Sequence, residues 1–212
     1  MAKRWVACIS QTGSELYTIC ETMLRKPDAL VITNKSKVIP GIWDLEIDNV
    51  YIFDKRPSTE QLLDVFKDAD VITLHGYLYI LPPDICKRFA GKIFNGHPGL
   101  ITKYPELVGK DPQIRAWNKY PSYGCVLHEV TAAVDRGPII DSQEIDAYLV
   151  KDLDDLFIVL KDMSISLWLR FFLEKFEEEN LRENCYAHSS FGNRIYRKEH
   201  ATQSTTEDQL LF

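Results

Sequence analysis

The sequence predicts an α/β protein with a mostly parallel central sheet, flanking helices and a long C-terminal helix. Two observations lead to this prediction. In the first half of the chain, short apolar runs alternate with segments whose apolar residues recur at helical spacing, which is the pattern of a parallel sheet with covering helices. Residues 152–179 then form one long stretch with apolar residues at helical spacing.

The length of the chain, 212 residues, is sufficient for a single domain with a full hydrophobic core. Hydrophobic residues make up 45% of the chain and charged residues 26%, as in ordinary globular proteins. We expect one folded domain over residues 1–180. The remainder, residues 181–212, is polar, and we expect it to be a partly disordered C-terminal extension.

Charge, hydropathy and cysteine pattern disfavour several classes of protein. The net charge of -6 provides no basic footprint, so nucleic acid is not expected as a partner. No apolar run approaches the roughly 18 residues of a membrane span, and the N-terminus lacks the apolar stretch of a signal peptide. The cysteines are scattered without a CxxC pair, so we expect free thiols in a reducing cytoplasm rather than disulfides or a zinc site. They are Cys8, Cys20, Cys86, Cys125 and Cys185.

Alternating strands and helices are expected in the first half of the chain. The expected strands are residues 5–9, 29–33, 50–53 and 70–74. The expected helices are residues 15–24, residues 58–68, and a short helix that follows Pro82 and Pro83 and ends near Phe89. Ser58 and Gln61 have the spacing of a capping box at the start of the second helix.

The second half is expected to begin with a strand that ends within residues 92–100. The elements after it are a helix at 113–118, paired strands at 124–130 and 137–141, the long helix, and a short strand at 194–196. The long helix is rich in aromatic residues. Trp168, Phe171 and Phe172 could pack either in the core or in a homodimer interface, and periodicity leaves both open.

The first candidate site is the segment KIFNGHPGL, residues 92–100. Its apolar run ends in a Gly/Pro-rich turn, as at the C-terminal end of a buried strand, where α/β sheets bind their ligands. Asn95 and His97 are two residues apart, so both side chains point to the same side of an extended backbone. An amide donor and a titratable imidazole together can polarise a carbonyl and move a proton. A structural role for the histidine stays open.

Two further segments bear on this site. The turn after the first strand carries Gly13 and Ser14 at the start of a helix, so it is either a tight strand–helix turn or an anion site; Glu15 argues against a phosphate there. Asp135 lies in the turn between the paired strands. A carboxylate near His97 would raise the pKa of the imidazole and hold its ring, but the residues alone do not show that the two meet.

Several motifs together resemble the folate-dependent formyltransferase family. They are Asn95-Gly96-His97-Pro98, Lys103-Tyr104-Pro105, His128 in GCVLHEV, and the run from Val134 to Ile140, which reads VDRGPII. Residues 69–83, ADVITLHGYLYILPP, resemble the segment that walls the folate pocket in that family. The resemblance extends from about Trp5 to Phe176. It implies the Rossmann-like formyltransferase fold.

The resemblance also implies a reaction and a set of site residues. The donor would be 10-formyltetrahydrofolate, the acceptor a primary amine of a small molecule, and no metal would be needed. Asn95 and protonated His97 would stabilise the oxyanion of the tetrahedral intermediate, while Asp135 would orient His97 and keep it charged. The pterin would contact two segments, represented by Leu78, Tyr79, Ile80, Leu81, Thr131, Val134 and Gly137.

The acceptor is left open by departures from the family pattern. Glycinamide ribonucleotide formyltransferases usually carry Gly-x-Gly-Ser-Asn after the first strand, whereas this chain carries Gln11-Thr12-Gly13-Ser14-Glu15. We therefore favour an amino-sugar nucleotide over glycinamide ribonucleotide as the acceptor. Gly13 and Ser14 would contact it, and Lys110 either contacts an anionic group or lies in a surface turn. A formyltetrahydrofolate hydrolase and a non-catalytic folate- or nucleotide-binding protein are the further alternatives.

Overall fold

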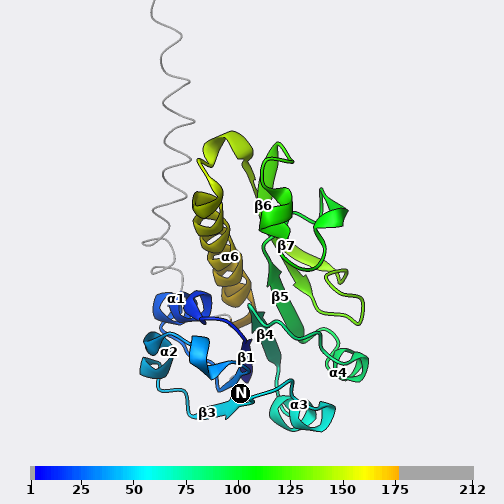
Figure 1. Cartoon of the computed structure of the whole chain (residues 1–212). Coiled ribbons are helices and arrows are strands. Elements are labelled where there is room, and N and C mark those ends of the chain that lie inside the picture. Colours follow the sequence, from blue (N-terminus) through cyan, green and yellow to red (C-terminus); the bar gives the residue numbers. More distant parts are fainter. Residues whose placement is uncertain (1–2, 177–212) are drawn as a thin grey trace, which may run out of the picture.

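The computed structural model describes residues 3–176, and within them seven strands form one sheet in the order β3-β2-β1-β4-β5-β6-β7 (Figure 1). The strands are β1 (Trp5–Ile9), β2 (Ala29–Ile32), β3 (Asn49–Ile52), β4 (Val71–His75), β5 (Ile93–His97), β6 (Ser122–Glu129) and β7 (Ile139–Asp146). The pairs from β3 to β5 are parallel, and β5, β6 and β7 pair antiparallel. The predicted fold class, mostly parallel α/β, is confirmed.

The helices agree with most of the predicted segments. They are α1 (Ser14–Met23), α2 (Pro40–Asp44), α3 (Thr59–Phe66), α4 (Pro83–Arg88), α5 (Pro112–Ala116) and α6 (Leu153–Phe176), with 3-10 turns at Lys35–Lys37, Pro105–Leu107 and Ala147–Leu149. The Ser58–Gln61 capping box is present at the start of α3. Helix α2 and the 3-10 turns were not predicted, because segments of one turn are too short to show a period. The predicted strand at 194–196 and extension at 181–212 lie outside the described residues.

Two hydrophobic cores lie on opposite faces of the sheet. Helices α1 and α6 cover one face, where Ala7 and Ile9 point from β1, and helices α3 and α4 cover the other, where Val6 and Cys8 point (Figure 1). This alternation follows from the period of two in a strand, and both faces of β1 are fully buried. The continuous apolar run WVACI is therefore what a central parallel strand requires.

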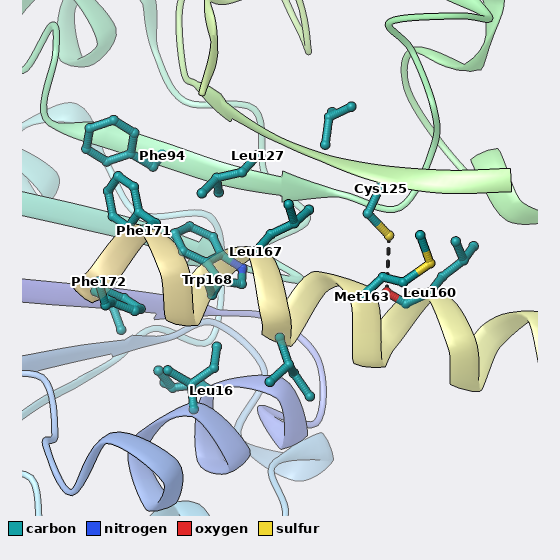
Figure 2. Close-up of a cluster of buried hydrophobic side chains, with 14 of the residues drawn as sticks. Leu16, Phe94, Cys125, Leu127, Leu160, Met163, Leu167, Trp168, Phe171 and Phe172 are labelled. Atoms are coloured by element: carbon teal, nitrogen blue, oxygen red, sulfur yellow. Dashed lines mark hydrogen bonds between the residues drawn. The ribbon is translucent and has the colours of Figure 1, made fainter. Parts of the chain in front are cut away.

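The aromatic residues of α6 belong to the core of this chain. Trp168 and Phe172 are fully buried. The ring centroid of Phe171 lies 4.6 Å from that of Phe94 on β5, within the range of about 4.5–7 Å that aromatic pairs prefer. Figure 2 shows Phe171 and Trp168 pointing from α6 toward the strands that carry Phe94 and Leu127, with Leu16 of α1 on the other side of the helix. Of the two alternatives left open by the sequence, packing in the core is the observed one for these residues.

Strand β5 is the last of the parallel strands, and β6 and β7 continue the sheet beyond it with antiparallel pairing. Strand β6 runs antiparallel to β5, with Asn95 opposite His128 and His97 opposite Val126. Strand β6 therefore ends beside the start of β5, where the Val130 N–H donates to the Ile93 carbonyl, and the turn between β6 and β7 folds back for Asp135 to reach His97. Within residues 3–176, no helix is both long enough and apolar enough to cross a membrane.

Candidate active site

Asn95 and His97 occupy the last part of β5. Both side chains lie on the sheet face opposite α6, as their spacing predicts, because the intervening Gly96 faces Trp168 and Ser164 of α6. A Cβ on Gly96 would lie 2.9 Å from Trp168 Nε1, so the helix packs where a side chain would otherwise stand. His97 is 5% exposed, and Asn95 is half-buried. The two polar side chains thus lie at the C-terminal end of β5, and helix α6 covers the other face of this strand.

Asp135 lies against His97, as the resemblance implies. Its Oδ2 is 3.5 Å from His97 Nδ1, and its Oδ1 is 3.5 Å from His128 Nε2. The backbone N–H of Gly109 donates to Oδ2 at 2.9 Å. The carboxylate therefore faces two imidazoles and one amide, and it bridges the turn after β6 and the loop after β5.

His128 is the site residue to which sequence reasoning assigned no role. Its Nδ1 lies 2.9 Å from the carbonyl oxygen of Glu129, and a carbonyl only accepts, so this nitrogen carries a proton. The other nitrogen, Nε2, lies 3.3 Å from the Asn95 amide nitrogen and 3.5 Å from Asp135 Oδ1. The signal that finds His128 is the β5–β6 register, which places it directly opposite Asn95. That register is not visible in the sequence.

The pKa values of His97 and Asp135 are both lowered, for different reasons. Burial is the largest influence on His97 and lowers its pKa; Asp135 and the Leu107 carbonyl oppose this, but the net shift is downward. Burial raises the pKa of Asp135, but His128, His97 and the Gly109 amide together outweigh it, so the net pKa lies below its usual value. Asp135 thus raises the pKa of His97 as expected, but burial costs the imidazolium more than Asp135 returns, so the net shift is downward.

The turn that carries Asp135 has unusual backbone geometry. Asp135 has φ 50°, a left-handed conformation that aspartate tolerates better than most residues. At Gly137 a Cβ would lie 1.8 Å from the Glu129 carbonyl oxygen, so only glycine fits. Thr131 caps the turn by donating to the Ala133 carbonyl at 3.2 Å, and Val134 is exposed.

A pocket of about 260 Å³ adjoins this turn. It is lined by Asp135, Arg136 and Gly137 from the turn, and by Ile101, Pro105 and Val108 from the loop after β5, among others. The residue whose carboxylate lies beside His97 thus also lines the pocket. Among residues 3–176, no group of three or more His, Cys, Asp or Glu side chains is placed to hold a metal ion.

The segment predicted to bind the pterin divides into exposed and buried parts. Leu78 and Ile80 are 63% and 61% exposed, while Tyr79 is half-buried with its ring 6.0 Å from that of Tyr77. Leu81 is only 5% exposed and packs in the core under α3 and α4. The Leu81 side chain therefore points into the core, whereas the side chains of Leu78 and Ile80 are exposed.

The α1 turn has a different electrostatic character from the one the sequence indicated. Gly13 caps α1 with φ 74°, and Ser14 begins the helix. The Glu15 carboxylate accepts from Ser164 Oγ at 2.5 Å and lies 2.8 Å from His75 Nδ1, so it is turned into the protein. The objection that Glu15 would repel a phosphate at this turn is therefore weaker than its position in the sequence suggested. The Lys110 side chain is 91% exposed, one residue after Gly109.

Together, Asn95, His97 and Asp135 have the composition of an acid–base catalytic site. An amide donor, an imidazole and a carboxylate meet at the edge of an α/β sheet, beside a pocket, and can polarise a carbonyl and transfer a proton. The formyl transferase family model matches residues 3–165. The chain therefore belongs to the formyl transferase family of enzymes.

The chain is similar to several individual members of this family. Phosphoribosylglycinamide formyltransferase of Haemophilus influenzae is 31% identical over 151 residues, which are 65% of this chain and 70% of that protein. The trifunctional purine biosynthetic protein adenosine-3 of Drosophila melanogaster is 30% identical over 153 residues; these are 65% of this chain but only 11% of that longer protein. The crystal structure of phosphoribosylglycinamide formyltransferase from Streptococcus pneumoniae superposes with a TM-score of 0.73 at 20% identity, over 82% of this chain and 99% of that one.

Proposed function

We propose that the protein transfers the formyl group of 10-formyltetrahydrofolate to the primary amine of glycinamide ribonucleotide. The observation that carries the proposal is the meeting of Asn95, His97 and Asp135 at the end of β5, in a chain of the formyl transferase family. The sequence favoured an amino-sugar nucleotide as the acceptor. Glycinamide ribonucleotide now takes precedence, because phosphoribosylglycinamide formyltransferases are prominent among the relatives and Glu15 is turned away from the α1 terminus.

In the proposed reaction, a bond forms between the acceptor nitrogen and the formyl carbon, and the bond from that carbon to the folate nitrogen breaks. The proton lost by the amine ends on the folate nitrogen that leaves. Asn95 supplies one donor for the oxyanion of the tetrahedral intermediate, and protonated His97 supplies its Nδ1 N–H, because its Nε2 N–H already donates to the Leu107 carbonyl. Asp135 opposes the effect of burial on His97, which favours the protonated imidazole that such a donor requires. His128 holds the Asn95 amide and shares Asp135.

The folate is proposed to lie between two surfaces near these groups. One is the exposed part of the segment after β4, with Leu78, Tyr79 and Ile80. The other is the turn from Thr131 to Gly137, whose backbone presents polar groups near Asp135. The acceptor is proposed to contact Gly13 and Ser14 at the α1 terminus, where backbone N–H groups favour an anion, with Lys110 available to an anionic group.

The test is formyl transfer from 10-formyltetrahydrofolate, followed by the absorbance of the tetrahydrofolate product. The acceptors are glycinamide ribonucleotide, a panel of amino-sugar nucleotides, and no amine. Each is measured with wild type, with His97→Ala, and with His200→Ala, a histidine outside the family match, as the control. We expect turnover with glycinamide ribonucleotide in wild type and the control, and its loss in His97→Ala.

Other outcomes identify the alternatives. Turnover with an amino-sugar nucleotide alone would replace the proposed acceptor with the one that the sequence favoured. Turnover without any amine would indicate a hydrolase. Folate binding without turnover on any acceptor would indicate a binding protein. A fold stabilised by NAD but not by folate analogues would indicate a nicotinamide-dependent oxidoreductase, a class that the absence of a GxGxxG motif disfavours, and would contradict the proposal altogether.

A further inference from the structure

Arg115 makes an unusual set of contacts with the backbone near the site. Its guanidinium donates to the carbonyl oxygens of Glu106 at 2.6 Å and of Leu107, Val108 and Lys110 at 2.9 Å each. All four acceptors belong to residues 106–110, which we call the clamp loop. One side chain on the short helix α5 thus binds nearly every carbonyl of one irregular segment.

The clamp loop in turn holds both members of the His97–Asp135 pair. The Leu107 carbonyl oxygen accepts from His97 Nε2 at 3.0 Å as well as from Arg115, and a carbonyl oxygen has two lone pairs for this purpose. The Gly109 N–H donates to Asp135 Oδ2 at 2.9 Å. Arg115 is therefore linked to His97 through Leu107. It is linked to Asp135 through Gly109, whose neighbours Val108 and Lys110 both accept from Arg115.

The clamp loop depends on this support because it has little regular structure of its own. Apart from the 3-10 turn at Pro105–Leu107 it has no helix or strand bonds, and Gly109 has φ 88°, which side chains rarely adopt. A guanidinium suits the task because its N–H groups form a planar fork that reaches several carbonyls at once, whereas a lysine ammonium is a point charge. Its charge also lies close enough to His97 to lower the pKa of the imidazole.

We propose that Arg115 is a positioning residue, which keeps His97 and Asp135 in register by fixing the clamp loop that binds them both. The inference rests on the proposed formyl transfer. It assigns Arg115 no contact with either substrate. Without the fork, the peptide groups of Leu107 and Gly109 lose the hydrogen bonds that orient them, and the two backbone contacts to His97 and Asp135 are weakened.

The experiment compares Arg115→Gln and Arg115→Lys with wild type in the formyl-transfer assay. Arg170→Gln is the matched control, because Arg170 pairs through two nitrogens with Asp141, at 2.8 Å each, away from the clamp loop. We expect kcat to fall roughly 10- to 100-fold in both Arg115 variants, as for a small misplacement of reacting groups, with the KM for folate within about twofold. Arg170→Gln should match wild type.

A pH profile separates positioning from general destabilisation. The groups that face Asp135 are His97, His128 and the Gly109 N–H, and all three lower its pKa. Loosening the clamp loop removes the Gly109 contribution, so the pKa of Asp135 rises and the acidic limb of kcat/KM moves to higher pH. A kcat loss with an unchanged pH profile, a loss no larger than that of Arg170→Gln, or full activity in Arg115→Lys would each overturn the proposal.

A second readout is independent of turnover. Hydrogen exchange at the Gly109 amide and the nitrogen-15 titration of His97 report the two loop contacts directly, and both should change in the Arg115 variants. If wild type transfers no formyl group, the proposed function fails, but these measurements still test whether Arg115 positions His97 and Asp135. Unchanged exchange and titration in the Arg115 variants would overturn that positioning role. If Arg115→Gln does not fold, Arg115→Lys supplies both measurements, since it keeps the charge and removes only the fork.

Discussion

Asp135 shows how one residue is made available to two histidines. Its left-handed backbone, φ 50°, turns the carboxylate back toward β5 and β6, where it meets His97 and His128 and accepts from Gly109. Their combined effect holds the pKa of Asp135 below its usual value despite burial. The carboxylate therefore stays ionised at neutral pH, which is what it needs to support charge on an imidazole.

Replacing Asp135 with asparagine removes this charge with little change in shape. Asp135 opposes the effect of burial on His97, so the pKa of His97 should fall further below its usual value in Asp135→Asn, and less of the imidazole is protonated at any pH. A nitrogen-15 titration of His97 measures the shift, and formyl transfer should fall about 10²- to 10⁴-fold. Asp141→Asn, which weakens the pair with Arg170 and alters the acceptor of the Ser142 N–H but does not touch His97, is the control. A higher pKa of His97 in the variant would contradict this account.

Gly137 should not tolerate even one methyl group. In Gly137→Ala the new Cβ would lie 1.8 Å from the Glu129 carbonyl, so the turn must move, and we expect a loss of about 1–3 kcal/mol in the free energy of unfolding together with reduced formyl transfer. Urea denaturation and the transfer assay measure the two effects. In Gly91→Ala the Cβ meets nothing within 4 Å, so only the strain of its positive φ remains and transfer should persist. Equal transfer by Gly137→Ala and wild type would exclude a role for the turn.

At the scale of elements, β5 serves a different purpose on each face. One face presents Asn95 and His97 to the site, and on the other Gly96 allows Trp168 of α6 to pack against the strand. Phe94 continues this packing against Phe171. The strand that carries the reactive groups is therefore held by the longest helix of the described chain, so the site rests on a rigid support.

The N-terminus of α3 should depend on its capping box. Ser58 Oγ accepts from the Gln61 N–H at 3.2 Å, and the Gln61 side chain accepts from the Ser58 N–H at 2.8 Å. Ser58→Ala should lower the free energy of unfolding by about 0.5–2 kcal/mol, measured by urea denaturation. Thr22→Ala in α1 loses only a hydroxyl bond to the Thr18 carbonyl and should change stability by less than about 0.5 kcal/mol. If both variants unfold at the same midpoint, the cap contributes nothing.

At the scale of the whole molecule, the two cores enclose the cysteines that the structure describes. Cys8, Cys20, Cys86 and Cys125 are buried and free, and Cys125 donates to the Leu160 carbonyl at 3.1 Å (Figure 2). The expectation of free, buried thiols is thus confirmed for these four, and Cys185 lies outside the described residues. Burial raises the pKa of each of the four, that of Cys20 to about 12.

These thiols should report whether the sheet and its helices stay closed. In a Cys185→Ser background at pH 8, we expect Ellman's reagent to react with the native protein far more slowly than with a free thiol, because the reagent attacks thiolate and none is accessible. All four thiols should react at once in guanidinium chloride. Rapid reaction of even one thiol in the native protein would show that a core opens readily.

Some features of the fold and the candidate site could be predicted from the sequence, and others could not. The βαβ rhythm, the capping box at Ser58, and the assignment of Asn95 and His97 to one side of a strand end all follow from local periods and spacings, which a sequence displays directly. The pairing of Asp135 with His97 came from a resemblance, because the two are far apart along the chain. The burial of Leu81, and of Glu15 against His75 and Ser164, could not be predicted, since each depends on which distant element packs against it.

The sequence by itself thus determined the fold class, the central strand and the placement of Asn95 and His97 on one side of a strand end. The tertiary structure decided their electrostatics and support. It placed His128 opposite Asn95, turned the net pKa shift of His97 downward, and placed the clamp loop between Arg115 and the His97–Asp135 pair. The physical reason is that secondary structure follows from interactions between near neighbours along the chain, whereas burial and charge pairing sum over atoms that only folding brings together.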